Sequence, residues 1–322
     1  MARCAVGIDI GGTFTKLALV DELGGILWHS KIPTQAHGRP DEYLARLCSL
    51  IEPLLASRPL GIGASVPGIF APDCRSIVYN PNTPALVGVD FYDLLEAFHL
   101  PVRLEQDLNA PAAAEYAFGC GRGSRRFVAA SLGTGAGTGV ILDGQMLRFS
   151  GNFAGDTGHI ILNPDGPPCT AGCRGCAEAM LAAPAVERAA RQAFDDPRGA
   201  MLRAAAEGDH IPARAVIAAA QSGDPLAVEI MRGIGRQAGQ WLASLAPIYL
   251  PDRFALCGGV AEVGLPLLEA CRERFYQLCG SGYAQCTIEL GTFRGLSGVI
   301  GAATPFLVDI EEQNPLDTDT RG

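Results

Sequence analysis

Short β-rich, mostly hydrophobic runs fill the first third of the chain, and stretches with helical spacing of hydrophobic positions interrupt them. The β-rich runs predict strands over residues 3 to 10, 14 to 20, 25 to 32, 60 to 66 and 101 to 105. The helical spacing predicts helices over residues 41 to 57, 90 to 98 and 108 to 118. Glycine-rich turns at residues 11 to 13 and 22 to 25 make the first three strands an antiparallel series.

A second block starts at the glycine-dense residues 119 to 124 and opens in a similar way, with strand, glycine turn and strand over residues 126 to 149. We predict helices over residues 178 to 194, 212 to 221, 225 to 246 and 296 to 307, and a strand over residues 253 to 257. The repeated opening indicates a duplicated α/β fold of two lobes with a ligand cleft between them. We assign residues 1–119 to an N-terminal lobe, to which a helix at about 296–322 returns, and residues 120–295 to a C-terminal lobe.

Length and composition agree with two lobes, because 322 residues that are 48% hydrophobic suffice for a large core. The net charge of −9 disfavours nucleic acid as a partner. The first strand follows Met1 without a leader, and no apolar run approaches the length of a membrane span. We therefore expect a cytoplasmic protein that does not contact membranes, with its eleven cysteines reduced.

Two glycine turns are candidate phosphate sites, because glycine lets backbone N–H groups approach an anion. The first follows Asp9, which is placed to orient hydrated Mg²⁺, and Thr13 and Thr15 add hydroxyl groups to it. The second spans residues 132 to 139 and fits neither the dinucleotide fingerprint nor a Walker A loop. A third pair, Gly258 and Gly259, follows a late strand and would flank an adenosine. A plain β-turn with a solvated Asp is the alternative interpretation of the first turn.

Asp107 is the candidate general base. It lies where a strand ends and an alanine-rich helix begins, among Glu105, Gln106 and Asn109. A simple helix cap is the alternative interpretation, but a cap does not explain so many polar neighbours. If a sugar hydroxyl binds there, Asp107 accepts its proton during attack on phosphorus, a reaction in which position, Mg²⁺ and charge neutralisation do most of the work.

Residues 155–178 form a third candidate site. Here a glycine-rich segment carries His159 together with Cys169, Cys173 and Cys176, which are a complete tetrahedral zinc set. Asp156 and Glu178 remain as acceptors for a ligand rich in hydroxyl groups. A loop of free thiols without metal is the alternative.

In combination these segments resemble the ROK family of repressors, open reading frames and sugar kinases. The resemblance covers residues 4 to 307. The motifs that carry it, in order, are Asp9 to Thr13, Ser65 to Gly68, Asn80 to Asn82, Gln106-Asp107, Leu132 to Gly135, Gly155 to His159, the cysteine loop to Glu178, Cys257 to Gly259 and Gly295 to Ala302. It implies an actin/hexokinase-like, ribonuclease H-like fold that binds ATP and Mg²⁺ between its lobes and phosphorylates the 6-hydroxyl of a hexose.

The resemblance also implies roles for single residues, with Asp107 as catalytic base and His159 shared between sugar and zinc. The expected ATP and Mg²⁺ site comprises Asp9, Gly11, Gly12, Thr13, Lys16, Gly133, Thr134, Gly135, Gly258 and Gly259. The expected sugar site comprises Gly68, Asn82, Gln106, Asp107, Asp156, His159 and Glu178, and the expected zinc ligands are His159, Cys169, Cys173 and Cys176.

Three departures from the family pattern concern the sugar and zinc sites. Gln106 stands where the family usually has Asn, and Asp156 where it usually has Glu, so a changed hexose preference is expected. Ala171 occupies the second cysteine position of the family's loop, and Cys173 follows two residues later.

An ATP-dependent hexose kinase is therefore the leading hypothesis. Residues 80 to 84 and 90 to 94 resemble those of allose kinases, while glucose, mannose and N-acetylated hexosamines are alternative substrates. The other hypotheses are a catalytically altered sugar-binding protein and a regulatory ROK protein. Repressors of the family carry a helix-turn-helix domain before the first hairpin, which the position of Asp9 and the acidic charge disfavour. A homodimer is the expected assembly.

Overall fold

Two α/β units make up the computed structural model, which describes residues 3–34, 37–80, 83–149, 155–206 and 210–308. The first unit comprises residues 1–123, 139–155 and 296–322, and the second comprises residues 124–138 and 156–295. Residues 139–155 thus group with the first unit, whereas the boundary expected near residue 120 placed them in the second. The predicted cleft between lobes stays a prediction.

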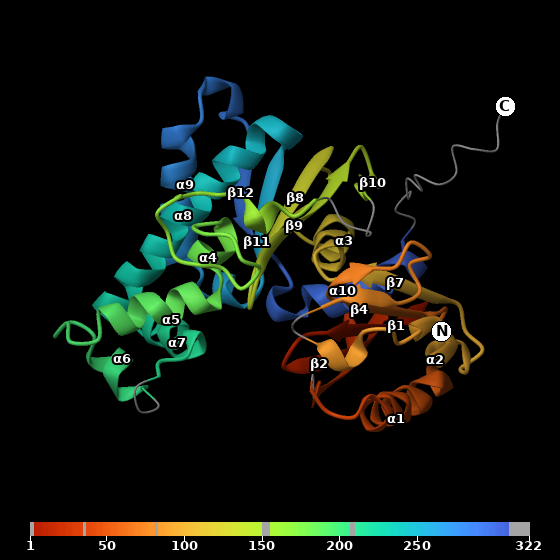
Figure 1. The fold of residues 1–322 in the computed structure, drawn as a ribbon. Helices are drawn as coiled ribbons and strands as arrows, with labels where there is room; N and C mark the ends of the chain where they lie inside the picture. The colour runs from red at the N-terminus through yellow and green to blue at the C-terminus, as the bar shows by residue number, and fades with distance from the viewer. Residues whose placement is uncertain (1–2, 35–36, 81–82, 150–154, 207–209, 309–322) are drawn as a thin grey trace. The chain divides into compact units, whose positions relative to one another are not determined.

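The first unit is built on a five-stranded sheet of order β3-β2-β1-β4-β7 (Figure 1). Strands β3, β2 and β1 pair antiparallel, and β1, β4 and β7 pair parallel. The bounds are β1 (Cys4–Ile10), β2 (Phe14–Asp21), β3 (Ile26–Pro33), β4 (Ile62–Val66) and β7 (Val102–Gln106). The carboxyl ends of the three parallel strands therefore meet at one edge of the sheet.

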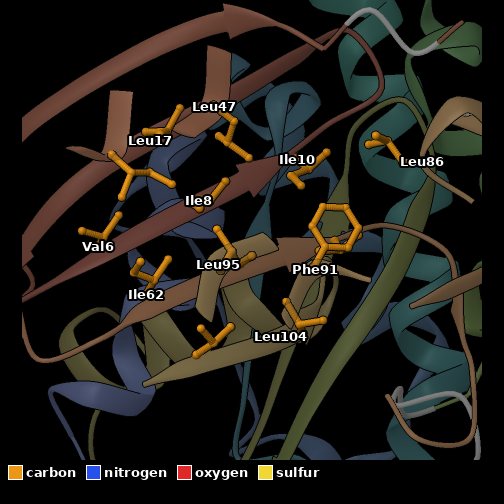
Figure 2. Close-up of a cluster of buried hydrophobic side chains, with 14 of the residues drawn as sticks. Val6, Ile8, Ile10, Leu17, Leu47, Ile62, Leu86, Phe91, Leu95 and Leu104 are labelled. Carbon is orange, nitrogen blue, oxygen red and sulfur yellow. The ribbon is translucent and has the colours of Figure 1, made fainter. Parts of the chain in front are cut away.

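Helices α1 (Pro40–Ile51) and α2 (Phe91–Glu96) cover one face of this sheet. Their buried side chains interdigitate with those of every second residue of the strands, as the two-residue period of a strand requires (Figure 2). The cluster includes Ile8 and Ile10 of β1, Leu47 of α1 and Phe91 of α2, all at most 1% exposed. The small hairpin of β5 (Ile69–Phe70) and β6 (Ile77–Tyr79) adds Phe70 and Ile77 to it.

Helix α10 (Ser297–Ala303) covers the opposite face, so residues 297–303 return to the first strands of the chain (Figure 1). It also packs against α3 (Asn109–Phe118). A side chain at Gly7 or Gly63 would overlap the α10 backbone at Val299 or Ala302. These glycines therefore let the helix lie directly on β1 and β4.

A second five-stranded sheet repeats the plan with the order β10-β9-β8-β11-β12, and its strands β8, β11 and β12 lie wholly in the second unit. Its bounds are β8 (Arg126–Leu132), β9 (Ala136–Leu142), β10 (Gln145–Met146), β11 (Arg253–Cys257) and β12 (Thr287–Leu290). Helices α8 (Pro225–Tyr249) and α9 (Leu265–Leu278) pack closely against each other, and Phe275 of α9 meets Phe254 of β11 edge to face. The remaining helices are α4 (Ala177–Leu181), α5 (Ala183–Gln192), α6 (Ala200–Ala204) and α7 (Ala213–Gln221). No helix in the described ranges is long and apolar enough to cross a membrane.

Most predicted elements are confirmed, and two differences stand out. The helix expected over residues 178 to 194 is broken into α4 and α5 at Ala182, which is extended. Pro184 is tolerated in the first turn of α5, but its missing N–H and its ring would disrupt a helix that continued from α4. Helix α9 and strand β12 were not predicted, although Leu268, Cys271 and Phe275 follow helical spacing. The prediction of a duplicated α/β fold is confirmed by two sheets whose strands follow the same order.

Candidate active site

A row of polar side chains crosses the first sheet near the carboxyl ends of its parallel strands. Strand register makes neighbours of Lys31 and Lys16, Lys16 and Asp9, Asp9 and Ser65, and Ser65 and Glu105. All five side chains lie on the face opposite the apolar cluster, because their strand neighbours belong to that cluster. The sheet thus brings the acids of β1 and β7 to one level, with the buried hydroxyl of Ser65 between them.

Asp9 is the acid of this row on β1. Its Oδ2 lies 3.3 Å from Lys16 Nζ, and both side chains are partly buried. A Cβ atom added at Gly298 would lie 2.7 to 2.8 Å from all three carboxylate atoms, so the N-terminal turn of α10 rests directly on Asp9. This contact fixes the carboxylate at the end of β1 and next to the first glycine turn.

Asp107 lies between β7 and α3, at the same edge of the sheet. Gln106, which is 6% exposed, donates from Nε2 to Asp107 Oδ1 at 2.7 Å and accepts at Oε1 from the Leu108 N–H at 2.8 Å. The N-cap position of α3 belongs to Leu108 and has no side-chain capping bond. Asp107 is therefore not the side-chain cap of this helix, and its carboxylate is held by a neighbouring amide.

The environment of Asp107 favours its neutral form. Burial raises the pKa of Asp107 to about 7, and the negative charge of Asp9 adds to the rise, against the opposing effect of nearby backbone N–H groups. A carboxyl group with this pKa takes up and releases protons near neutral pH, as a general base requires.

Glu105 and Arg148 form a buried ion pair behind Asp107, which the sequence did not lead us to expect. Arg148 Nη2 donates to Glu105 Oε2, while Asn109 Nδ2 donates to Oε1 at 2.8 Å. The Gln106 N–H also donates to Glu105 Oε1, at 2.9 Å. These bonds fix the backbone at the β7 to α3 junction. Arg148 lies 43 residues away in the chain, so only the fold brings it to Glu105.

The first glycine turn joins β1 to β2 and contains Gly11, Gly12 and Thr13. The Gly11 N–H donates to the Phe14 carbonyl at 3.0 Å, and Thr13 is exposed at the tip. The expectation that the Thr15 hydroxyl contacts phosphate is wrong. Thr15 is 0% exposed and its hydroxyl lies 2.9 Å from that of Thr34, because β2 directs this side chain to the same face as its core leucines.

Gly68 lies at the end of β4 in the left-handed region, with φ +112°. A Cβ atom there would lie 2.6 Å from the Tyr79 carbonyl oxygen and 2.9 Å from Asn80 Cβ, so only glycine fits without displacing β6. Asn80 Nδ2 donates to the Pro67 carbonyl at 2.9 Å, which ties the two predicted sugar loops together. Asn82 lies outside the described residues.

The second glycine turn, Gly133 to Gly135, occupies the equivalent place between β8 and β9. A Cβ atom at Gly258 would lie 2.4 to 2.9 Å from the Leu132 backbone, so the loop after β11 lies against this turn. Next to that loop the ends of β11 and β12 enclose a pocket of about 170 Å³. Its lining includes Cys257, Gly258, Glu262 and Arg294. Of the three predicted glycine sites, the structure brings two together here.

The predicted zinc ligands converge in the second unit. One atom each from His159, Cys169, Cys173 and Cys176 lies within 4.8 Å of the others. His159 Nδ1 is 3.8 Å from Cys169 Sγ and 3.5 Å from Cys173 Sγ. Tetrahedral zinc with ordinary bond lengths requires nitrogen to sulfur separations of about 3.6 Å, so the donor set fits this metal. A bond from the Cys169 N–H to the Cys173 carbonyl at 2.8 Å brings the displaced cysteine into the set.

Asp156 and Glu178 flank this cluster on different sides. His159 Nε2, the ring nitrogen that does not face the thiols, lies 3.7 Å from Asp156 Oδ1, and the Asp156 side chain is 66% exposed. Glu178 Oε1 accepts from the Cys169 thiol at 3.3 Å, while its Oε2 accepts from the Ala136 N–H at 3.3 Å. Glu178 therefore connects the cysteine loop to the second glycine turn.

Comparison with known proteins identifies the class. The fold and the paired glycine turns are those of the actin/hexokinase-like proteins. The family model described as the ROK family matches residues 5–308, and the chain belongs to this family.

Its relatives include sugar kinases. The chain is 32% identical over 308 residues to a glucokinase of Streptomyces coelicolor, covering 92% of this chain and 96% of the relative. It superposes with a TM-score of 0.83 on a ROK glucokinase from Streptomyces griseus in complex with glucose and AMPPNP, at 31% identity, covering 93% of this chain and 98% of that one. An N-acetylmannosamine kinase of Salmonella paratyphi A is 35% identical over 189 residues, covering 58% of this chain and 64% of the relative.

Proposed function

We propose that this ROK-family sugar kinase transfers the terminal phosphoryl group of ATP to the 6-hydroxyl of a hexose, with Asp107 as general base. The geometry around Asp107 carries the proposal. One carboxylate oxygen is fixed by the Gln106 amide, and the pKa of Asp107 is raised to about 7 by burial and by Asp9. A base so placed takes the hydroxyl proton as the oxygen attacks phosphorus.

Asp9 is the proposed anchor for hydrated Mg²⁺, with Lys16 beside it for a phosphate oxygen. The donor set fits, because carboxylate oxygens suit Mg²⁺ and because two acids at one sheet edge attract a cation. When bound, Mg²⁺ neutralises charge on the phosphates. The Asp9 carboxylate lies against α10, and Gly12 and Thr13 offer backbone N–H groups next to it, whereas the Gly11 N–H already donates to the Phe14 carbonyl.

The second unit is proposed to hold the rest of the nucleotide. Gly133, Thr134 and Gly135 offer a second, uncharged turn for phosphate, and Gly258 and Gly259 border the pocket at the ends of β11 and β12. The Streptomyces griseus relative was crystallised with AMPPNP, which supports ATP as the phosphoryl donor. Glu262 and Arg294 are the charged residues of this pocket's lining.

His159, Cys169, Cys173 and Cys176 are the proposed ligands of a structural zinc ion, which would staple the loop that carries Asp156 and His159. Metal analysis of purified protein should find about one equivalent of zinc. The variant Cys173→Ser should lose it, whereas Cys48→Ser, at a cysteine far from the cluster in sequence, should keep it. Less than about half an equivalent in the unaltered protein would refute the site.

The hexose substrate is proposed from the relatives and from the two departures from the family pattern, Gln106 and Asp156. Two of the relatives described above are glucokinases and one is an N-acetylmannosamine kinase, while the loop after β6 resembles that of allose kinases. Gly68, Asn82 and Gln106 in the first unit and Asp156, His159 and Glu178 in the second are the proposed sugar-contacting residues. Because Gln106 already bonds Asp107 and the Leu108 N–H, its contribution to sugar binding is proposed to be the placement of the base.

A coupled assay for ADP tests the proposal across glucose, mannose, allose, N-acetylglucosamine and N-acetylmannosamine. We expect turnover of at least one unmodified hexose and none of its 6-deoxy analogue, because that analogue lacks the acceptor oxygen. Turnover confined to the N-acetylated sugars would replace hexose by hexosamine as the substrate class. Calorimetric binding of a hexose with no ADP formed would instead favour a sugar-binding or regulatory role.

The homodimer and the cytoplasmic location stay predictions, as does the absence of a nucleic-acid partner.

A further inference from the structure

A chain of three buried hydroxyl groups lies behind the first glycine turn. Thr34 Oγ1 donates to the Gly11 carbonyl at 2.7 Å, Thr15 Oγ1 lies 2.9 Å from Thr34 Oγ1, and Tyr43 Oη lies 2.8 Å from Thr15 Oγ1. All three side chains are at most 1% exposed. They come from β2, from the residue after β3 and from α1, so three elements converge on one peptide group.

The direction of every bond in this chain follows from proton counting. The Gly11 carbonyl only accepts, so the single Thr34 proton is used there. Thr34 must then accept from Thr15, and Thr15 must accept from Tyr43. Burial raises the pKa of Tyr43 to about 12, so its phenol remains protonated and stays a donor. Bonds that run in one direction strengthen one another.

Thr34 makes a second hydrogen bond to the turn, since its N–H donates to the Thr13 carbonyl at 3.0 Å. The Gly11 carbonyl therefore points inward, towards Thr34. A trans peptide group directs its N–H opposite to its carbonyl, so the Gly12 N–H points away from Thr34. Gly12 is itself partly exposed.

We infer that Tyr43, Thr15 and Thr34 are positioning residues that fix the Gly11–Gly12 peptide group so that the Gly12 N–H is presented to a phosphate oxygen of ATP. The inference rests on the proposed function, since it concerns the nucleotide of that reaction. The fixed N–H gives the phosphate a donor that needs no reorientation on binding. Without the three hydroxyl groups, the Gly11–Gly12 peptide group is free to rotate, and nucleotide binding must first order it.

Calorimetry with AMPPNP and Mg²⁺, and separately with glucose, tests the inference. Thr34→Val should weaken AMPPNP binding about five- to tenfold, because it removes the bond to the Gly11 carbonyl and nearly preserves the side-chain shape. Tyr43→Phe, which removes the last donor of the chain, should weaken it about two- to threefold. Glucose affinity should change less than twofold in both variants.

Two further variants separate positioning from loss of stability. Thr34→Ser restores the hydroxyl and should bind AMPPNP within about twofold of the unaltered protein. Thr304→Val is the matched control, because Thr304 is also fully buried in the first unit and donates to a backbone carbonyl, that of Ile300, at 2.9 Å. It should lower the melting temperature and leave AMPPNP affinity unchanged.

The outcomes distinguish this inference from the proposed function. An unaltered protein that does not bind AMPPNP would overturn both. If the unaltered protein binds AMPPNP and Thr34→Val binds it equally well, only the inference fails. It also fails if Thr304→Val weakens AMPPNP binding as much as Thr34→Val does.

Discussion

The two five-stranded sheets have the same strand order, yet they place charge differently at the turn between equivalent strands. In the first unit the strand before the turn ends with Asp9, whose carboxylate pairs with Lys16. In the second unit Ser131 and Thr138 hold the corresponding positions relative to Gly133, and both are uncharged. The two turns thus share a backbone arrangement but differ at these two positions, where only the first unit carries charged side chains. The second turn instead receives a carboxylate from the cysteine loop, because Glu178 Oε2 accepts from the Ala136 N–H. The proposed general base and the proposed magnesium ligand both belong to the first unit.

Replacing the base should have the largest effect. Asp107→Asn should lower kcat about 10³-fold, because the amide cannot accept the hydroxyl proton. Asp73→Asn, at an exposed aspartate of the same unit, is the control and should stay within about twofold. Because the pKa of Asp107 is about 7, kcat should fall as the pH drops through 7, where the base becomes protonated. A flat profile between pH 6 and 8 would argue against Asp107 as the base.

The same substitution should change stability in the opposite sense. A carboxyl group whose pKa is raised by folding costs stability once the pH exceeds its unfolded value, so ionised Asp107 destabilises the protein at pH 8. Asp107→Asn should therefore raise the melting temperature at pH 8 and leave it unchanged near pH 4. Loss of both activity and stability at pH 8 would indicate misfolding.

The contrast between the turns is tested directly by a pair of variants at equivalent positions. Asp9→Asn should lower kcat about 10²-fold and weaken the dependence on Mg²⁺, because the carboxylate that orients the cation is gone. Ser131→Ala in the second unit should change kcat less than threefold. Equal losses in steady-state assays at several Mg²⁺ concentrations would show that the two turns share the charged chemistry.

The sequence was sufficient to predict most of the fold and several site residues. It was not sufficient where contacts between residues distant in the chain determine the position of a side chain. The alternation of β1 to β3 and the motifs around Asp9 and Asp107 were sufficient to predict the fold and the principal acids. The burial of Thr15 was missed, although the two-residue period of β2 places it on the same face as Leu17. Its partner Tyr43 lies 28 residues away, which local patterns do not reveal.

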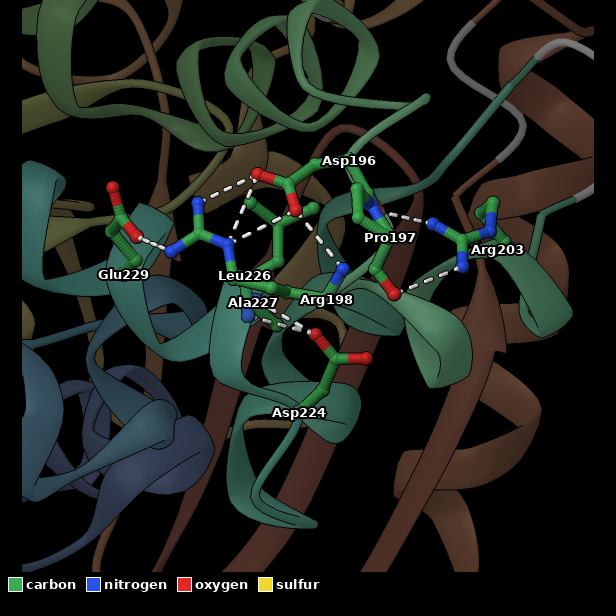
Figure 3. A network of polar contacts seen from close by, with 8 residues as sticks. All are labelled: Asp196, Pro197, Arg198, Arg203, Asp224, Leu226, Ala227 and Glu229. Carbon is green, nitrogen blue, oxygen red and sulfur yellow. Dashed lines mark hydrogen bonds and ion pairs between the residues drawn. The ribbon is translucent and has the colours of Figure 1, made fainter.

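Asp224, a buried aspartate of the second unit, has a different role from the one proposed for Asp107. Asp224 is 2% exposed and accepts backbone bonds from Leu226 and Ala227 at the start of α8 (Figure 3). It accepts two more from Met201 and Leu202 at the start of α6. Burial alone would raise the pKa of Asp224, but these N–H groups lower it below its usual value. Asp224 thus joins two helices, whereas Asp107 is proposed to transfer a proton.

Asp224→Asn should lower the free energy of unfolding of the second unit by about 2 kcal/mol at pH 7, because an amide nitrogen must face backbone donors. Since its pKa is depressed by folding, this stabilisation is present above pH 4 and is lost as the pH falls through the folded value. Glu229→Gln is the control. Its ion pair with Arg198 is exposed and should contribute less than about 1 kcal/mol (Figure 3). Thermal unfolding at pH 7 and pH 3 measures both variants.

The smallest expected effect comes from replacing a glycine of each turn by alanine, because the space for a Cβ atom differs between the two turns. A Cβ atom at Gly11 would lie 2.9 Å from the Phe14 backbone oxygen, whereas one at Gly133 meets nothing within 4 Å. Gly11→Ala should therefore strain the first turn and weaken AMPPNP binding about fivefold, while Gly133→Ala should fold normally and bind AMPPNP within about twofold. Equal weakening by the two alanines would mean that both turns approach phosphate so closely that any Cβ is excluded. The second turn would then contact the nucleotide as closely as the first. The difference between the two turns would be limited to the proposed roles of Asp9 in binding Mg²⁺ and of Asp107 in accepting a proton.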